Sequence, residues 1–182
     1  MRGNLLQCLG FTLTELMVTV AIIGIIASLG VPSFQAVLQQ NRASSTANEL
    51  IAALNMARSE AIKRGQIVSL CKSSTISDEE PSCSEDTTWS SGWIVFVDAD
   101  GDGSVDDSDT RLKIGHASGN NTTLQETGDG ESAYISYLPN GFIRWSDPDS
   151  ADATLEICAG SAKRTIDIGA SGRVHITKGT CS

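Results

Sequence analysis

CLGFTLTELMVTVAIIGIIASLGVP occupies residues 8–32 and contains a single charged side chain, Glu15. From Phe11 to Val31 the chain has 21 residues. A helix rises about 1.5 Å per residue, so this run would be about 31 Å long, which is enough to cross the apolar core of a bilayer. The sequence therefore predicts a transmembrane helix over residues 11–31 and raises the question of why it contains a glutamate.

The ten residues before this run end in Gly10. A secretory signal peptide has its small-residue cleavage site after the apolar stretch, whereas here the small residue comes first. Processing at Gly10 would leave the apolar run attached to the mature chain. Residues 1–10 are therefore predicted to be a leader that is removed.

G-FTLTE followed by LMVTVAIIGIIASLGVPSF closely resembles the N-terminus of type IV pilins and type II secretion pseudopilins. The resemblance implies that prepilin peptidase cleaves between Gly10 and Phe11 and that Phe11 is N-methylated. It also implies that Glu15 acts in filament assembly, that other pilins are partners through this helix, and that the chain lies in the bacterial inner membrane before assembly with a periplasmic head.

A role for Glu15 also follows from the cost of burying a charge in lipid. A buried carboxylate needs a partner, and the new amine of Phe11, on the same helix or on a neighbouring subunit, would lie about one helical turn away. The alternative is an ordinary membrane anchor with a glutamate at the lipid interface. That alternative does not explain Gly10 directly before FTLTE.

Apolar residues continue after Pro32 at intervals of three and four, which predicts that the helix runs on over residues 32–64. Lys63 and Arg64 suit the negative end of the helix dipole, and Gly65 is expected to cap it. The apolar stripe is expected to pack on a sheet, and it consists of Phe34, Leu38, Ala47, Leu50, Leu54, Ala57 and Ala61.

Residues 65–182 are predicted to form a β-rich head, because short β-type runs alternate there with turn signals. Asn140-Gly141 in LPNGF indicates a hairpin with a type I′ turn. Residues 73–91 and 115–131, rich in Ser, Thr, Gly and Asn, are expected to be surface loops. A long helix followed by strands predicts an α+β fold, with strands in IVSLC, WIVFV, RLKIG, AYISYL, FIRW, TLEIC, RTIDIG and RVHIT.

The charge balance is acidic, with 22 acidic and 13 basic residues. Such a surface argues against general electrostatic capture of nucleic acid. Five cysteines are present, and Cys8 lies in the predicted leader. Of the three pairings of the other four we favour the two local ones, although free buried thiols are an alternative; the favoured disulfides are Cys71–Cys83 and Cys158–Cys181.

The order of motifs along the whole chain narrows the family. NELIAALNMARSEAIKRGQIVSLC, GWIVFVDADGDGSVDDSDTRLK, LPNGF and the terminal GRVHITKGTCS resemble the GspH/FimT group of minor pilins and pseudopilins. The resemblance implies a minor pilin of the FimT/FimU kind in type IV pilus assembly, in the initiating or tip complex. Two alternatives are a type II secretion pseudopilin H and a pilus-tip subunit that binds DNA for uptake.

DADGDGSVDDSD resembles a Ca²⁺-binding loop, because oxygen ligands alternate along it and Gly103 permits a sharp turn. The final ligand is an aspartate instead of the longer glutamate, and a strand precedes the loop. An acidic hairpin tip without metal is the alternative. The candidate ligands are Asp98, Asp100, Asp102, the Ser104 carbonyl, Asp106 and Asp109.

A late GRxR element is implicated in DNA binding in relatives of the FimT kind. Here the second arginine is replaced by His175, which is mostly neutral near pH 7. The alternative is a solvated strand beside a disulfide. The candidate DNA-binding residues are Arg173, Lys163, Arg164 and Lys178.

Enzymatic activity is not expected. The chain has two histidines, neither in a recognisable nucleophile motif, and its thiols are assigned to disulfides. No cofactor other than Ca²⁺ is expected.

Overall fold

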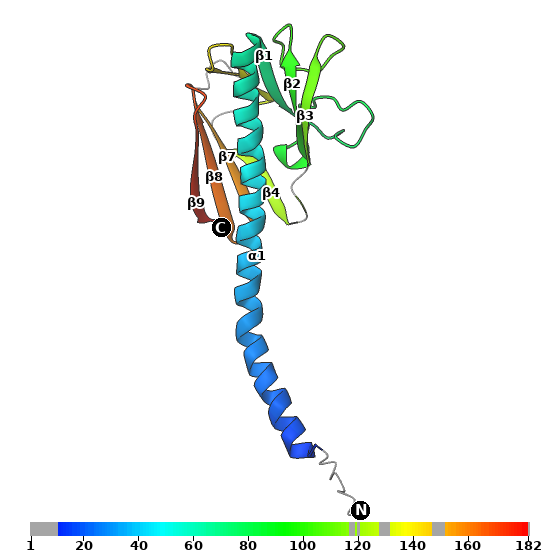
Figure 1. Ribbon diagram of the computed structural model, residues 1–182, viewed down its shortest axis with the longest axis vertical. Helices are drawn as coiled ribbons and strands as arrows, with labels where there is room; N and C mark the ends of the chain where they lie inside the picture. Colours follow the sequence, from blue (N-terminus) through cyan, green and yellow to red (C-terminus); the bar gives the residue numbers. More distant parts are fainter. Residues whose placement is uncertain (1–10, 117–118, 120, 128–131, 147–151, 182) are drawn as a thin grey trace, which may run out of the picture. The chain divides into compact units, whose positions relative to one another are not determined.

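The computed structural model describes residues 11–116, 119, 121–127, 132–146 and 152–181, so Gly10 and the predicted leader lie outside it. The described part of the chain divides into two units, with the boundary between Leu38 and Gln39. In the described residues one long helix, α1 (Leu13–Arg64), precedes all the strands, which lie in the second unit (Figure 1). The predicted α+β fold is confirmed.

Both ends of α1 have local capping residues. The Thr12 hydroxyl oxygen accepts a hydrogen bond from the Glu15 amide at 3.3 Å, as an N-cap does. At the other end Gly65 adopts a φ of 66° and donates its amide to the Ala61 carbonyl at 3.0 Å. Glycine takes this left-handed conformation without steric cost, so the helix ends where the sequence predicts.

The buried stripe of α1 begins later than predicted. Phe34 and Leu38 are exposed by 63% and 38%. The β7–β8 turn reaches the helix at Gln39, whose side-chain oxygen accepts the Ser161 amide at 3.2 Å. From there to the end of the helix one face is covered by the sheets, and its fully buried residues are Ala43, Ala47, Leu50, Ala53, Leu54, Ala57 and Ala61.

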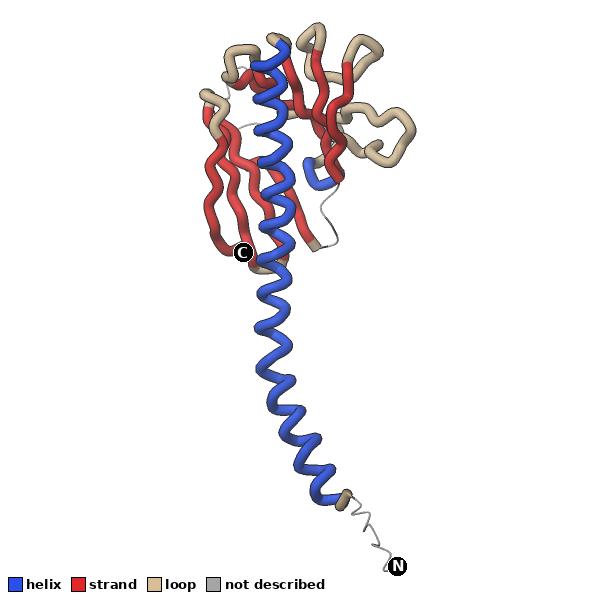
Figure 2. The backbone as a smooth tube through the Cα atoms, in the orientation of Figure 1, coloured by secondary structure: helices blue, strands red, loops and turns tan. Residues whose placement is uncertain are grey.

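The strands form two antiparallel sheets that pack on this half of α1 (Figure 2). The five-stranded sheet has the order β3-β2-β1-β5-β6. Its strands are β1 (Ile67–Lys72), β2 (Gly92–Asp98), β3 (Thr110–His116), β5 (Tyr134–Tyr137) and β6 (Ile143–Trp145). The four-stranded sheet has the order β4-β7-β8-β9. Its strands are β4 (Thr122–Thr127), β7 (Asp152–Ala159), β8 (Ala162–Gly169) and β9 (Val174–Thr180).

Strand β4 corrects the prediction that residues 115–131 are a loop. In TTLQET, Leu124 is the single large apolar residue, so hydrophobic alternation gives a weak signal. The strand forms because it pairs with β7 along its whole length and buries Leu124, which is 1% exposed. The loop at 73–91 is likewise not wholly on the surface, since it ends in the short helix η1 (Trp89–Ser91) with Trp89 buried.

The β5–β6 hairpin is present, but its turn is not of type I′. Such a turn needs positive φ at both central residues, and of the pair Asn140-Gly141 only Gly141 has it, at 80°. The Gly141 amide donates to the Leu138 carbonyl at 2.8 Å, with Pro139 in the second position. This is the pattern of a type I turn followed by a glycine bulge.

Two disulfides join neighbouring segments of the head. Cys71 bonds to Cys83, and Cys158 bonds to Cys181. They are the two local pairs favoured on the sequence. The first closes the loop that follows β1, and the second ties the end of β9 to β7.

Candidate functional site

The first half of α1 presents an apolar surface with one ionisable group. An 18-residue window of the helix has a mean hydropathy of 2.2, so by length and composition the helix could cross a membrane. Phe11 is 75% exposed. Glu15 is the only ionisable side chain from Phe11 to Asn41. A carboxylate on such a surface needs a partner from outside the helix when water is removed.

The acidic loop between β2 and β3 is organised by Asp98, which is 1% exposed. Its carboxylate accepts hydrogen bonds from the Ser69 hydroxyl at 2.6 Å and from the amides of Gly101 and Gly103 at 2.6 and 3.1 Å. Burial raises the pKa of Asp98, and these hydrogen bonds oppose that rise. The Arg144 guanidinium also donates to the Gly101 carbonyl.

Three of the predicted Ca²⁺ ligands lie together. Among the described residues, carboxylate oxygens of Asp98, Asp100 and Asp102 lie within 4.8 Å of one another. Asp109 is not part of this group. Its two oxygens accept hydrogen bonds from the amides of Ala99 and Asp106 at 2.9 and 3.1 Å. The group that could hold a cation is thus smaller than the predicted set, and Ca²⁺ binding stays a prediction.

The Asp106 side chain and the Ser104 amide form hydrogen bonds within the loop. The Asp106 carboxylate accepts the Ser108 amide and hydroxyl at 2.7 and 2.6 Å, and these bonds lower its pKa. The Ser104 amide donates to Asp102 at 2.7 Å. These contacts help to hold the loop in shape.

Two of the four basic residues predicted to bind DNA, Arg164 and Lys163, have partners within the fold. Arg164 is 7% exposed and donates to the Ser44 hydroxyl of α1 at 2.9 Å. Lys163 forms an ion pair with Glu156 of the adjacent strand. Arg173 precedes β9, and exposed Lys178 lies five residues further along, roughly 16 Å at strand spacing. DNA binding stays a prediction that this arrangement does not favour.

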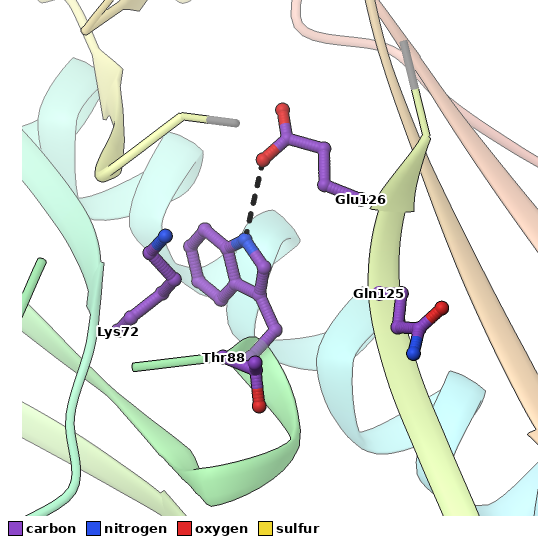
Figure 3. Close-up of a pocket in the computed structure, with 5 residues that line it drawn as sticks. Lys72, Thr88, Gln125 and Glu126 are labelled. Carbon is purple, nitrogen blue, oxygen red and sulfur yellow. Dashed lines mark hydrogen bonds between the residues drawn. The ribbon is translucent and has the colours of Figure 1, made fainter. Parts of the chain in front are cut away.

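A cavity of about 200 Å³ lies between the end of β1, η1 and β4 (Figure 3). Lys72, Thr88, Trp89, Gln125 and Glu126 line it. The Glu126 Oε2 atom accepts the Trp89 indole N–H at 3.3 Å and the Ser132 amide at 2.8 Å. No sequence motif marks this site, because its residues come from separate segments that were predicted to be loops or ordinary strand positions.

Two family models match the chain. Residues 46–172, more than half of the chain, match the family described as Type II transport protein GspH. The chain belongs to the GspH family. Residues 6–31 match the prokaryotic N-terminal methylation motif, which covers the predicted cleavage point and Glu15. No curated protein matches the chain.

Solved structures with a similar fold are crystal forms of the type IV minor pilin FimU of Pseudomonas aeruginosa PAO1. In space group P21, FimU is 24% identical with a TM-score of 0.56, and the match covers 75% of this chain and 89% of FimU. In space group P65 the identity is 24%, the TM-score is 0.51, and the coverages are 74% and 91%. At this identity the likeness is one of fold.

Membership of the GspH family defines the kind of protein. Members of the pilin and pseudopilin family are structural subunits and not enzymes. The family implies processing by prepilin peptidase and assembly with other pilins. The methylation motif and the apolar helix are consistent with a place in the inner membrane before assembly.

Proposed function

We propose that this GspH-family protein is a minor pilin that serves type IV pilus assembly as a subunit of the initiating or tip complex. The observation that carries the proposal is the head fold, which is similar to the minor pilin FimU over 89% of the FimU chain. The apolar surface of α1 with Glu15 near its start supports a role in assembly.

Assembly would replace lipid around the first half of α1 by neighbouring helices. The Glu15 carboxylate would then meet the amine of a processed Phe11 on a neighbouring subunit. In a low-dielectric environment such a pair is strong, and removing one partner leaves a buried charge that typically costs about 3–5 kcal/mol. A single substitution at Glu15 should therefore block incorporation without unfolding the head.

A second candidate is a pseudopilin of type II secretion, which the description of the matching family favours. The chain would use the same helix and the same glutamate in that role. The two candidates differ in the filament served, so one experiment can separate them.

The experiment is deletion of the gene, followed by measurement of surface-sheared pilin and of secreted type II substrates in the same cultures. The strain is complemented with the intact gene, with Glu15→Ala, and with Thr19→Val as a control on the same helix. If pilin disappears and returns with the intact gene and the control but not with Glu15→Ala, the proposal holds. Loss of secretion with unchanged pilin would assign the chain to type II secretion instead.

A further inference from the structure

Lys72, the last residue of β1, lies on the core-facing side of the strand, where the other residues are apolar. In β1, Val68 and Leu70 point into the core, and alternation places Lys72 on the same face. Lys72 is 3% exposed, and it pairs across the sheet with buried Trp93. The Lys72 side chain is therefore largely buried at the end of an apolar row, and it lines the cavity.

No hydrogen bond or ion pair of the Lys72 ammonium is found among the described residues. A buried ammonium is costly unless it is paired. Glu126 also lines the cavity, and its charge interacts with Lys72 electrostatically. Its Oε2 atom, however, is hydrogen-bonded to Trp89 and Ser132. The Lys72 ammonium, which has no hydrogen-bond partner among the described residues, is therefore available to a group that enters the cavity (Figure 3).

The volume restricts what can enter. At ~30 Å³ per water molecule, a cavity of this size has room for about six or seven waters. It is smaller than the roughly 300–1,000 Å³ of pockets for drug-sized ligands. A small planar group fits within this space, whereas a nucleotide or an oligosaccharide would extend beyond it.

We propose that this cavity binds a carboxylate group through the Lys72 ammonium. A carboxylate is favoured over a doubly charged phosphate, because Glu126 and the net charge of −9 repel the double negative charge more strongly than a single one. The carboxylate can belong to a free small acid or to the C-terminus of another protein chain, since both present the same group. The proposal does not depend on which filament the chain serves.

The test uses the full chain in detergent micelles and the NMR signal of the Trp89 indole N–H, assigned with a Trp89→Phe variant. Four ligands are titrated at constant ionic strength: sodium acetate, sodium phosphate, and a short neutral peptide with either a free or an amidated C-terminus. A saturable shift with acetate supports the proposal. If the peptide with the free C-terminus also binds and the amidated peptide does not, the cavity can accept the C-terminal carboxylate of a protein chain. If neither peptide binds, the ligand is a free small acid.

Lys72→Met tests the role of the ammonium, because methionine has a similar length and no charge. Binding should weaken about tenfold or more, as expected for loss of a charged hydrogen bond. Lys178→Met, an exposed lysine of β9, is the control and should bind as the parent does. If Lys72→Met does not fold, Lys72→Gln takes its place.

Three outcomes would overturn the proposal. The first is no saturable shift with acetate or with the free peptide. The second is phosphate binding as tightly as acetate, which would indicate simple ionic attraction. The third is unweakened acetate binding by a folded Lys72→Met or Lys72→Gln variant.

Discussion

The Arg58 guanidinium donates a hydrogen bond from Nη2 to the Ser171 carbonyl at 3.0 Å, joining α1 to the β8–β9 turn across 113 positions of sequence. Gly172, the next residue, packs closely against Arg58 and Gly141. A Cβ atom there would lie 2.4 Å from the Gly141 carbonyl oxygen and 3.3 Å from Arg58 Nε. The helix end, the LPNGF turn and the late glycine-arginine element, which are far apart in sequence, therefore form one contact.

The first prediction is that Gly172→Ala destabilises the head strongly. The substitution would combine a left-handed φ of 73° with a backbone clash, so we expect a loss of about 3 kcal/mol in the free energy of unfolding. Urea unfolding of the full chain in detergent measures it. Gly65→Ala is the matched control, because its φ is 66° but its Cβ would meet nothing within 4 Å. It should lose about 1 kcal/mol, and equal losses would contradict the clash.

The second prediction concerns the pH dependence caused by Glu126. Burial raises the pKa of Glu126 above its usual value, which the hydrogen bonds from Ser132 and Trp89 and the charge of Lys72 only partly oppose. The folded state then holds the proton more tightly than the unfolded state. This contribution to stability is present below the ordinary carboxyl pKa, about 4, and is lost as the pH rises through the raised pKa.

Glu126→Gln removes this titration and keeps an oxygen to accept the same hydrogen bonds. The difference in free energy of unfolding, variant minus parent, should therefore be larger at about pH 7 than at about pH 4, because only the parent loses stability as Glu126 ionises. Urea unfolding at both values measures the difference. Glu85→Gln, an exposed acid, is the control and should show a smaller change. A constant difference for Glu126→Gln would contradict the burial argument.

The third prediction is that Ca²⁺, if it binds the β2–β3 loop, acts through Asp98, Asp100 and Asp102. Adding Ca²⁺ should then raise the melting temperature of the parent, because the ion neutralises neighbouring carboxylates and binds the folded state. Asp100→Asn should abolish the rise, whereas Asp107→Asn, an exposed acid outside this group, should retain it. Absence of any rise in the parent would refute the site.

The fourth prediction is that Arg173 does not support DNA binding by this chain. Lys163 and Arg164 are engaged within the fold, so few cations remain to join Arg173 at a phosphate backbone. Salt-dependent binding of duplex DNA should be weak and equal for the parent and Arg173→Ala. A clear loss of DNA binding in Arg173→Ala would contradict this prediction and support a role in DNA uptake.

The sequence alone predicted those features whose signals are local. The end of α1 at Arg64 follows from Gly65, and most strands follow from alternation within a few residues. The two disulfides follow from proximity in sequence. The family follows from the order of short motifs, beginning with Gly10, Phe11 and Glu15, although the structure does not describe Gly10.

The tertiary structure decided what depends on partners far along the chain. Strand β4 forms because it pairs with β7. Arg164 is engaged within the fold because it donates a hydrogen bond to Ser44 of α1. Lys72 lines a cavity because residues of η1 and β4 lie beside the end of β1. Periodicity and capping act over a few residues, whereas burial and pairing are set by contacts between segments, and a single sequence carries no direct signal for those contacts.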